Sequence, residues 1–102
     1  MTHQLYPNWK ETIVFSPDGP QPQLLVENDK FKVILAGLEP GQKIPAHPEA
    51  QAMYHFLEGT GAMIVDGERL AVEAGTTVIT PQGAVRGVEA EARLAFLAAR
   101  VA

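Results

Sequence analysis

Two histidines lie in a polar stretch near the middle of the sequence, at a spacing suited to binding or catalysis. His47 and His55 are separated by Glu49, Gln51 and Met53 at alternate positions. Because successive side chains of a β-strand point to opposite faces, a strand through this stretch would place all five on one face. Imidazole, carboxylate and amide groups in one row suit a transition metal or a polar small molecule. The same row is also typical of a half-polar barrel lining without chemistry, and both interpretations stay open here.

Other residues offer little nucleophilic chemistry. The absence of cysteine excludes disulfides, thiolate metal sites and cysteine nucleophiles. Ser16 is the only serine, and it lies in a turn-forming segment with no histidine near it in sequence. We therefore expect no serine nucleophile. His3 lies in the N-terminal arm, where we expect solvent around it.

The composition is that of a small acidic protein. The 102 residues fit one domain, residues 1–102, with a net charge of -4 from 8 basic and 12 acidic residues. The basic residues are scattered, whereas nucleic-acid binding needs a positive stripe. No apolar run approaches the roughly 20 residues that span a bilayer, and the N-terminus lacks a signal-peptide pattern. We expect a cytoplasmic protein without nucleic-acid or membrane partners.

Short apolar segments separated by turn residues predict an all-β domain. The 9 glycines and 8 prolines favour turns over long helices. About nine or ten short strands, with turn signals every 8 to 12 residues or so, indicate a barrel or sandwich. The expected strands are residues 12–15, 23–27, 31–38, 53–58, 62–65, 69–73, 76–80, 84–88 and 93–101.

Turn chemistry refines this outline. Asp66-Gly67 is the strongest hairpin signal, since a type I′ turn needs positive φ at both central residues. Pro45 and Pro48 predict an extended loop before the strand at 53–58. Both parities of residues 93–101 are apolar, which favours a buried strand over an alanine-rich helix.

The chain divides into an arm and a barrel. Residues 1–22 form an N-terminal arm with a first strand, and residues 23–102 form the barrel. The arm carries Tyr6 and Trp9, so we expect it to pack on a neighbouring sheet or a partner subunit.

Two segments resemble the paired motifs of the cupin superfamily. The first family pattern begins with a glycine, five residues and then His-x-His; here Gly41 is followed by five residues and His47. The second pattern is Gly, five residues, Pro-x-Gly, two residues, His; here Gly75 and Pro81-Gln82-Gly83 lead to Arg86. The resemblance covers about residues 31–101. It implies a small single-domain, RmlC-like jelly roll, the double-stranded β-helix barrel of cupins.

The chain departs from the family at the ligand positions. Cupins that bind a metal usually present two His and one Glu from the first motif and one His from the second. Here Glu49 stands at the second His position, the Glu position falls near Ala52 or Met53, and Arg86 replaces the last His. Only His47 is retained. The resemblance therefore implies that most standard ligands are replaced, and we expect no metal at the standard site and no cofactor.

The first functional hypothesis is a small polar or anionic molecule bound in the barrel. Arg86 would hold a carboxylate or phosphate in place of the metal. The protein would be a binding or sensing module, or a metal-independent isomerase, epimerase or lyase with His47 and Glu49 as acid and base. The competing interpretation is that Arg86 pairs internally with Glu49 and merely fills a collapsed barrel, and the two interpretations are compatible in an unliganded protein. The expected ligand-binding residues are His47, Glu49, Gln51, Met53, His55 and Arg86.

The alternative is a metal-dependent, dioxygenase-like cupin with atypical ligands. A divalent transition metal would then be held by His47 with Glu49, Gln51 or His55. In either case we expect a homodimer by analogy with the family, with the arm around Trp9 and the strand at 93–101 at the interface.

Overall fold

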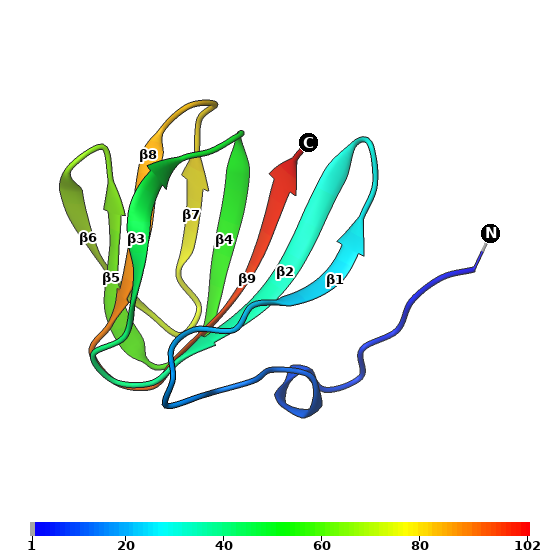
Figure 1. Ribbon diagram of the computed structural model, residues 1–102, viewed down its shortest axis with the longest axis horizontal. Coiled ribbons are helices and arrows are strands. Elements are labelled where there is room, and N and C mark those ends of the chain that lie inside the picture. Colours follow the sequence, from blue (N-terminus) through cyan, green and yellow to red (C-terminus); the bar gives the residue numbers. More distant parts are fainter. Residues whose placement is uncertain (1) are drawn as a thin grey trace.

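A computed structural model describes residues 2–102 as two antiparallel β-sheets that face each other (Figure 1). The five-stranded sheet has the order β1-β2-β9-β4-β7, and the four-stranded sheet has the order β3-β8-β5-β6. A short 3-10 helix, η1 (Trp9–Glu11), precedes them. The strands are β1 (Gln23–Glu27), β2 (Phe31–Leu38), β3 (Lys43–Pro48), β4 (Ala52–Glu58), β5 (Thr60–Val65), β6 (Glu68–Glu73), β7 (Thr77–Thr80), β8 (Val85–Ala90) and β9 (Leu94–Val101).

The expected all-β architecture is confirmed. Eight of the nine expected strands are present, with ends within two residues of the prediction. The Asp66-Gly67 hairpin is confirmed as well, because these residues have φ values of 48° and 85° and join β5 to β6. No helix within residues 2–102 has both the length and the apolar character needed to cross a membrane.

The expected first strand at residues 12–15 is wrong. This run has no strand pairing and instead packs against β2. A Cβ added to Gly37 would lie 2.7 Å from the Val14 carbonyl oxygen and 2.8 Å from the Phe15 ring. The apolar side chains of the run are thus used for packing on the barrel, and its backbone joins no sheet.

The expected loop around Pro45 and Pro48 is also wrong, because these residues belong to β3. This strand lies at the edge of the four-stranded sheet and carries an irregularity between Ile44 and His47. Edge strands and bulges are the positions in a sheet where a residue without an N–H is tolerated. The prolines therefore mark an edge strand.

The row of five side chains from His47 to His55 does not share one face. β3 ends at Pro48 and β4 begins at Ala52, and the two strands belong to different sheets. Alternation along the chain is interrupted by the residues that cross between the sheets. The expectation of one continuous strand face is wrong for this reason.

The core lies between the two sheets. Phe56 of β4 and Phe96 of β9 are buried with ring centroids 5.5 Å apart, and Met63 of β5 packs into the same cluster from the opposite sheet. Close approach at one end of the barrel requires a glycine: a Cβ on Gly59 would lie 1.8 Å from the Arg93 carbonyl oxygen.

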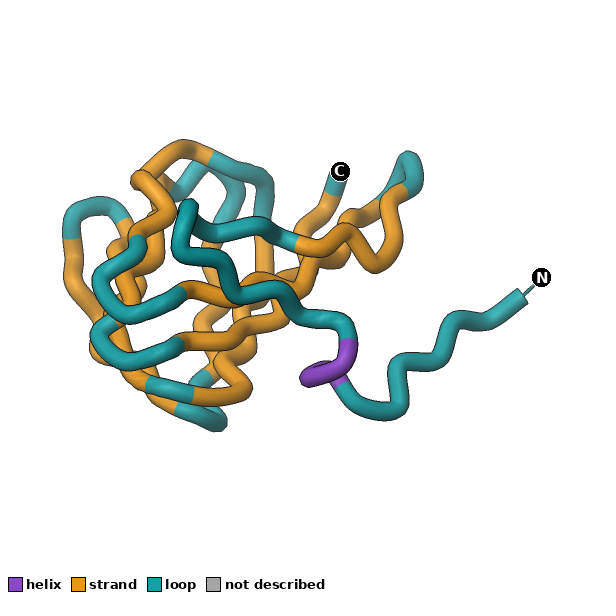
Figure 2. Tube along the Cα trace, turned by 60° about the horizontal axis from the view of Figure 1, so that its bottom comes forward, coloured by secondary structure: helices purple, strands orange, loops and turns teal. Residues whose placement is uncertain are grey.

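The N-terminal arm lies outside the barrel (Figure 1; Figure 2). The Gln4 side chain donates to the Leu25 carbonyl of β1 at 2.9 Å. Further along, Phe15 lies under the Arg93 guanidinium at 4.0 Å. The arm therefore contacts the five-stranded sheet at two points, through Gln4 on β1 and through Phe15 beside the start of β9.

Candidate functional site

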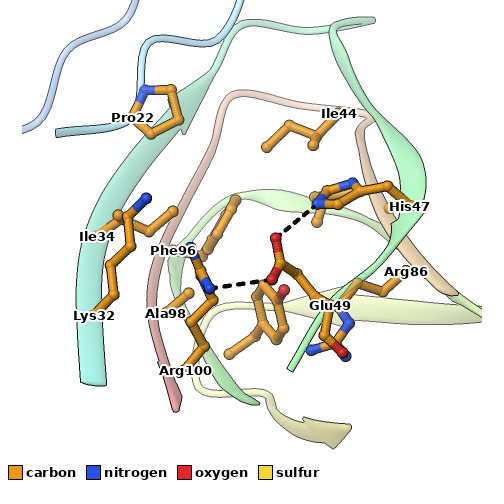
Figure 3. Close-up of a pocket in the computed structure, with 13 residues that line it drawn as sticks. Pro22, Lys32, Ile34, Ile44, His47, Glu49, Arg86, Phe96, Ala98 and Arg100 are labelled. Atoms are coloured by element: carbon orange, nitrogen blue, oxygen red, sulfur yellow. Dashed lines mark hydrogen bonds and ion pairs between the residues drawn. The ribbon is translucent and has the colours of Figure 1, made fainter. Parts of the chain in front are cut away.

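A cavity of about 240 Å³ lies between the two sheets (Figure 3). Its apolar wall consists of Ile34, Ile44, Val88, Phe96 and Ala98. Its polar side chains are Lys32, His47, Glu49, Tyr54, Arg86 and Arg100, and Pro22 and Gly87 complete the lining.

Strand alternation places most of these groups. On β9, Phe96, Ala98 and Arg100 share the inward face, and Arg100 pairs in register with Lys32 of β2. On the other sheet, His47 of β3 pairs with Arg86 of β8. Two strand pairs, one from each sheet, thus bring four basic side chains to one cavity.

The Glu49 carboxylate lies between two of these bases (Figure 3). Its Oε1 is 3.1 Å from Nη1 of Arg100, and its Oε2 is 3.5 Å from Nε2 of His47. The backbone carbonyl of Glu49 is fixed separately, because it accepts hydrogen bonds from the Gly83 N–H at 2.8 Å and from Arg86 Nη2 at 2.7 Å. The residue is therefore anchored by its backbone while its side chain reaches into the cavity.

His47 has a defined hydrogen-bond orientation. Its Nδ1 lies 2.9 Å from the Pro45 carbonyl oxygen, which can only accept, so Nδ1 carries a hydrogen. In the neutral ring the unprotonated nitrogen is then Nε2, on the side of Glu49. Nε2 therefore accepts a hydrogen bond in the neutral imidazole and donates one to Glu49 only in the imidazolium.

Arg86 is the largest fully buried side chain, with 1% of its surface exposed. Its Nε donates to the Ala84 carbonyl at 3.1 Å, and its Nη2 donates to the carbonyls of Glu49 and Pro81 at 2.7 Å and 3.2 Å. Its Nη1 has no hydrogen-bond partner among residues 2–102. The expected pairing with Glu49 therefore involves the backbone carbonyl and not the carboxylate.

Tyr54 of β4 adds a neutral hydroxyl to the cavity. Burial raises the pKa of this phenol above its ordinary value of 10.0, and the nearby Arg86 guanidinium opposes the rise only in part. The hydroxyl keeps its proton at neutral pH and is available as a donor.

The family model described as "Cupin domain" matches residues 34–99. The chain belongs to the cupin family. Among proteins with curated descriptions, none matches the sequence.

Several solved structures share the cupin fold of this chain. It is similar to a conserved protein of unknown function from Streptococcus pyogenes, with 22% identity, a TM-score of 0.87 and coverage of 99% of this chain and 90% of that one. An RmlC-like cupin from Desulfovibrio desulfuricans gives 22% identity, a TM-score of 0.81 and coverage of 99% and 95%. A mutant salicylate 1,2-dioxygenase from Pseudoaminobacter salicylatoxidans gives 19% identity, a TM-score of 0.75 and coverage of 81% and 27%. At these identities the likeness shows the fold alone.

This cupin brings together only some of the residues predicted for its site. His47, Glu49 and Arg86 line the cavity. Gln51 and Met53 instead line a shallow groove elsewhere, beside Phe31, Ile79 and Val101.

His55 also lies away from the cavity. Its Nδ1 is 2.7 Å from Oγ1 of Thr77 on the neighbouring strand β7. Gln51, Met53 and His55 all come after the chain has left β3, where the strand alternation that begins at His47 is interrupted, and they therefore lie outside the cavity.

Three polar residues of the cavity were not predicted from the sequence. These are the charged residues Lys32 and Arg100, and Tyr54 in the role of a hydroxyl donor. Arg100 had a usable signal, since it continues the parity of the buried Phe96 and Ala98. Lys32 had the matching signal on β2, where it shares the parity of Ile34 and Ala36.

The donor set of this cupin does not fit a transition metal. Among residues 2–102 there is no group of three or more His, Asp or Glu side chains placed to hold one. Only His47 and Glu49 lie together, and Arg100 engages the carboxylate. A buried guanidinium at the second-motif position adds a positive charge that opposes a bound cation.

Proposed function

We propose that this cupin binds a small anionic molecule in the cavity between its sheets. Lys32, His47, Arg86 and Arg100 line the cavity with one carboxylate, that of Glu49. The observation that carries the proposal is the state of Arg86, which is fully buried and bonded to carbonyl oxygens, with no carboxylate paired to it among residues 2–102. Its charge is poorly screened at such a depth, so it favours an anion in the adjoining space.

The cavity also supports a ligand with an apolar part. The apolar residues of its lining are Ile34, Ile44, Val88, Phe96 and Ala98. The volume of about 240 Å³ is below the range of roughly 300 to 1,000 Å³ typical of sites for drug-sized ligands. These properties favour a small carboxylate or phosphate compound over a large cofactor.

Proton transfer is a second capability of the same site. Nε2 of His47 and the Glu49 carboxylate are 3.5 Å apart and both line the cavity, so a ligand held there could approach both groups, as general acid–base catalysis needs. A binding or sensing module and a metal-independent isomerase, epimerase or lyase both use this geometry. His47→Asn separates them, because in a binding module it lowers affinity alone, whereas in an enzyme turnover falls by a larger factor than affinity.

The metal-dependent alternative requires ligands that the donor set does not supply. Protein purified without a chelator and without a histidine tag should contain metal well below one equivalent by elemental analysis. A full equivalent that is lost in both His47→Ala and Glu49→Ala would favour the metal-dependent reading.

Calorimetric titration tests the anion proposal. We expect benzoate or inorganic phosphate to bind, and the neutral isostere benzamide not to bind. Arg100→Met should weaken binding at least about tenfold, since a charge-assisted hydrogen bond contributes roughly 1.5–3 kcal/mol. Arg93→Met is the matched control, because Arg93 pairs with Glu39 outside the cavity. Failure of both anions to bind, or equal affinity for benzamide, would refute the proposal.

A further inference from the structure

The Glu49 side chain already makes the contacts that a bound carboxylate would make. One carboxylate oxygen faces Nη1 of Arg100 at 3.1 Å, and the other faces Nε2 of His47 at 3.5 Å. These two bases come from opposite sheets, and the carboxylate bridges the space between them (Figure 3). We infer that Glu49 is an internal stand-in for the ligand, and that the ligand is an apolar monocarboxylate whose carboxylate replaces that of Glu49 between Arg100 and His47. This inference rests on the proposed function and specifies its ligand class.

Glu49 can leave this position without a change of fold. Its backbone carbonyl is held by the Gly83 N–H and by Arg86, so only side-chain torsions need to change. The side chains of Glu49 and Arg100 are 27% and 30% exposed, and ion pairs with this degree of solvent access are weak. The residue also lies between β3 and β4, where no sheet pairing fixes its side chain.

The space between Arg100 and His47 that the Glu49 carboxylate occupies is here called the bridged position. Its surroundings favour a ligand with one carboxylate joined to an apolar body. The two oxygens of a single planar carboxylate contact Arg100 and His47 at once, as those of Glu49 do, and the contact with Nε2 is a hydrogen bond when His47 is an imidazolium. Arg86 is too deeply buried to take a second anionic group directly. The rest of the wall is apolar and includes Phe96 and Ile34. A displaced Glu49 carboxylate remains nearby and disfavours a second negative charge on the ligand.

Removing the charge of Glu49 tests the inference. Glu49→Gln keeps the size of the side chain but ends the competition for Arg100, so the affinity for benzoate should rise by roughly two- to fivefold over wild type. Glu49→Ala clears the position altogether and should behave in the same way. Glu39→Gln is the matched control, because it removes a carboxylate that pairs with Arg93 outside the cavity. Its affinity for benzoate should equal that of wild type.

The outcomes separate the inference from the proposed function. Unchanged or weaker benzoate binding in both Glu49 variants, with native folding by circular dichroism, overturns the inference. If wild type still binds inorganic phosphate in that case, the proposed function stands. If only the Glu49 variants bind benzoate and wild type binds no anion, Glu49 is not exchanged for a ligand in the native protein, and both the inference and the proposed function fail. In the double variant Glu49→Gln/Arg100→Met, the affinity for benzoate should fall back to that of wild type or below. This result would support binding of the carboxylate between Arg100 and His47.

Discussion

The Arg86 guanidinium donates a 2.7 Å hydrogen bond to the backbone carbonyl of Glu49, while the carboxylate of the same residue turns to Arg100. Glu49 thus contacts two arginines, Arg86 through its backbone and Arg100 through its side chain, and the two arginines have different roles. Arg86 joins the residues around Glu49 to those around Pro81 and Ala84. In our proposal, Arg100 is the arginine that pairs with the anion in the cavity.

Arg86→Met should destabilise the fold through lost hydrogen bonds. The carbonyls of Glu49 and Pro81 keep backbone partners, but the Ala84 carbonyl loses the donor that Arg86 provides. Leaving a buried acceptor unsatisfied costs roughly 1–3 kcal/mol in free energy of unfolding. Urea denaturation should show this loss, whereas Arg69→Met, at an exposed ion pair with Glu89, should change little. Equal effects of the two substitutions would show that Arg86 has no structural role.

Stability at high pH should depend on Tyr54. Its pKa is raised in the folded protein, mainly by burial, so the folded state keeps the phenol proton over a range where the unfolded chain has lost it. The resulting stabilisation is complete below the ordinary pKa of 10.0 and is lost as the pH rises through the pKa of the folded protein. Wild type should therefore lose more free energy of unfolding than Tyr54→Phe between about pH 9 and about pH 11. The control Tyr6→Phe should follow wild type, and parallel losses in all three would contradict the assignment.

Much of the fold was predictable from the sequence because its signals are local. Turn residues such as Asp66-Gly67 specify backbone dihedral angles directly, and alternating apolar residues specify strands. The prolines of β3 were misleading, because an edge strand can accept them and sequence alone does not show which strand is at an edge.

The site was less predictable because it is assembled by pairing between distant strands. Arg100 and Lys32 meet through the register of β9 on β2, which no local pattern records. Gln51 and His55 were misplaced because the chain crosses between the sheets after Pro48. His47, Glu49 and Arg86 were found through the cupin motif spacing, which already encodes the fold.

The outer face of the five-stranded sheet supports the expectation of a homodimer, which we retain as a proposal. Ile79 is 69% exposed and lines a shallow groove with Phe31, Met53 and Val101, which are also exposed. A second copy would cover these apolar side chains. Ile79→Glu should lower the mass in light scattering from dimer to monomer, while Val85→Glu, at an exposed residue of the four-stranded sheet, should not. A monomeric wild type would contradict the proposal.

The central claim is that an anion binds at the bridged position between Arg100 and His47 inside the barrel. A benzoate titration of ¹⁵N-labelled wild-type protein, followed by NMR, tests the location directly. We predict that the largest saturable shifts fall on amides of the cavity, at Glu49, Gly87 and Val88. Shifts centred on Ile79 and Met53 in the outer groove, or the absence of saturable shifts, would contradict the claim.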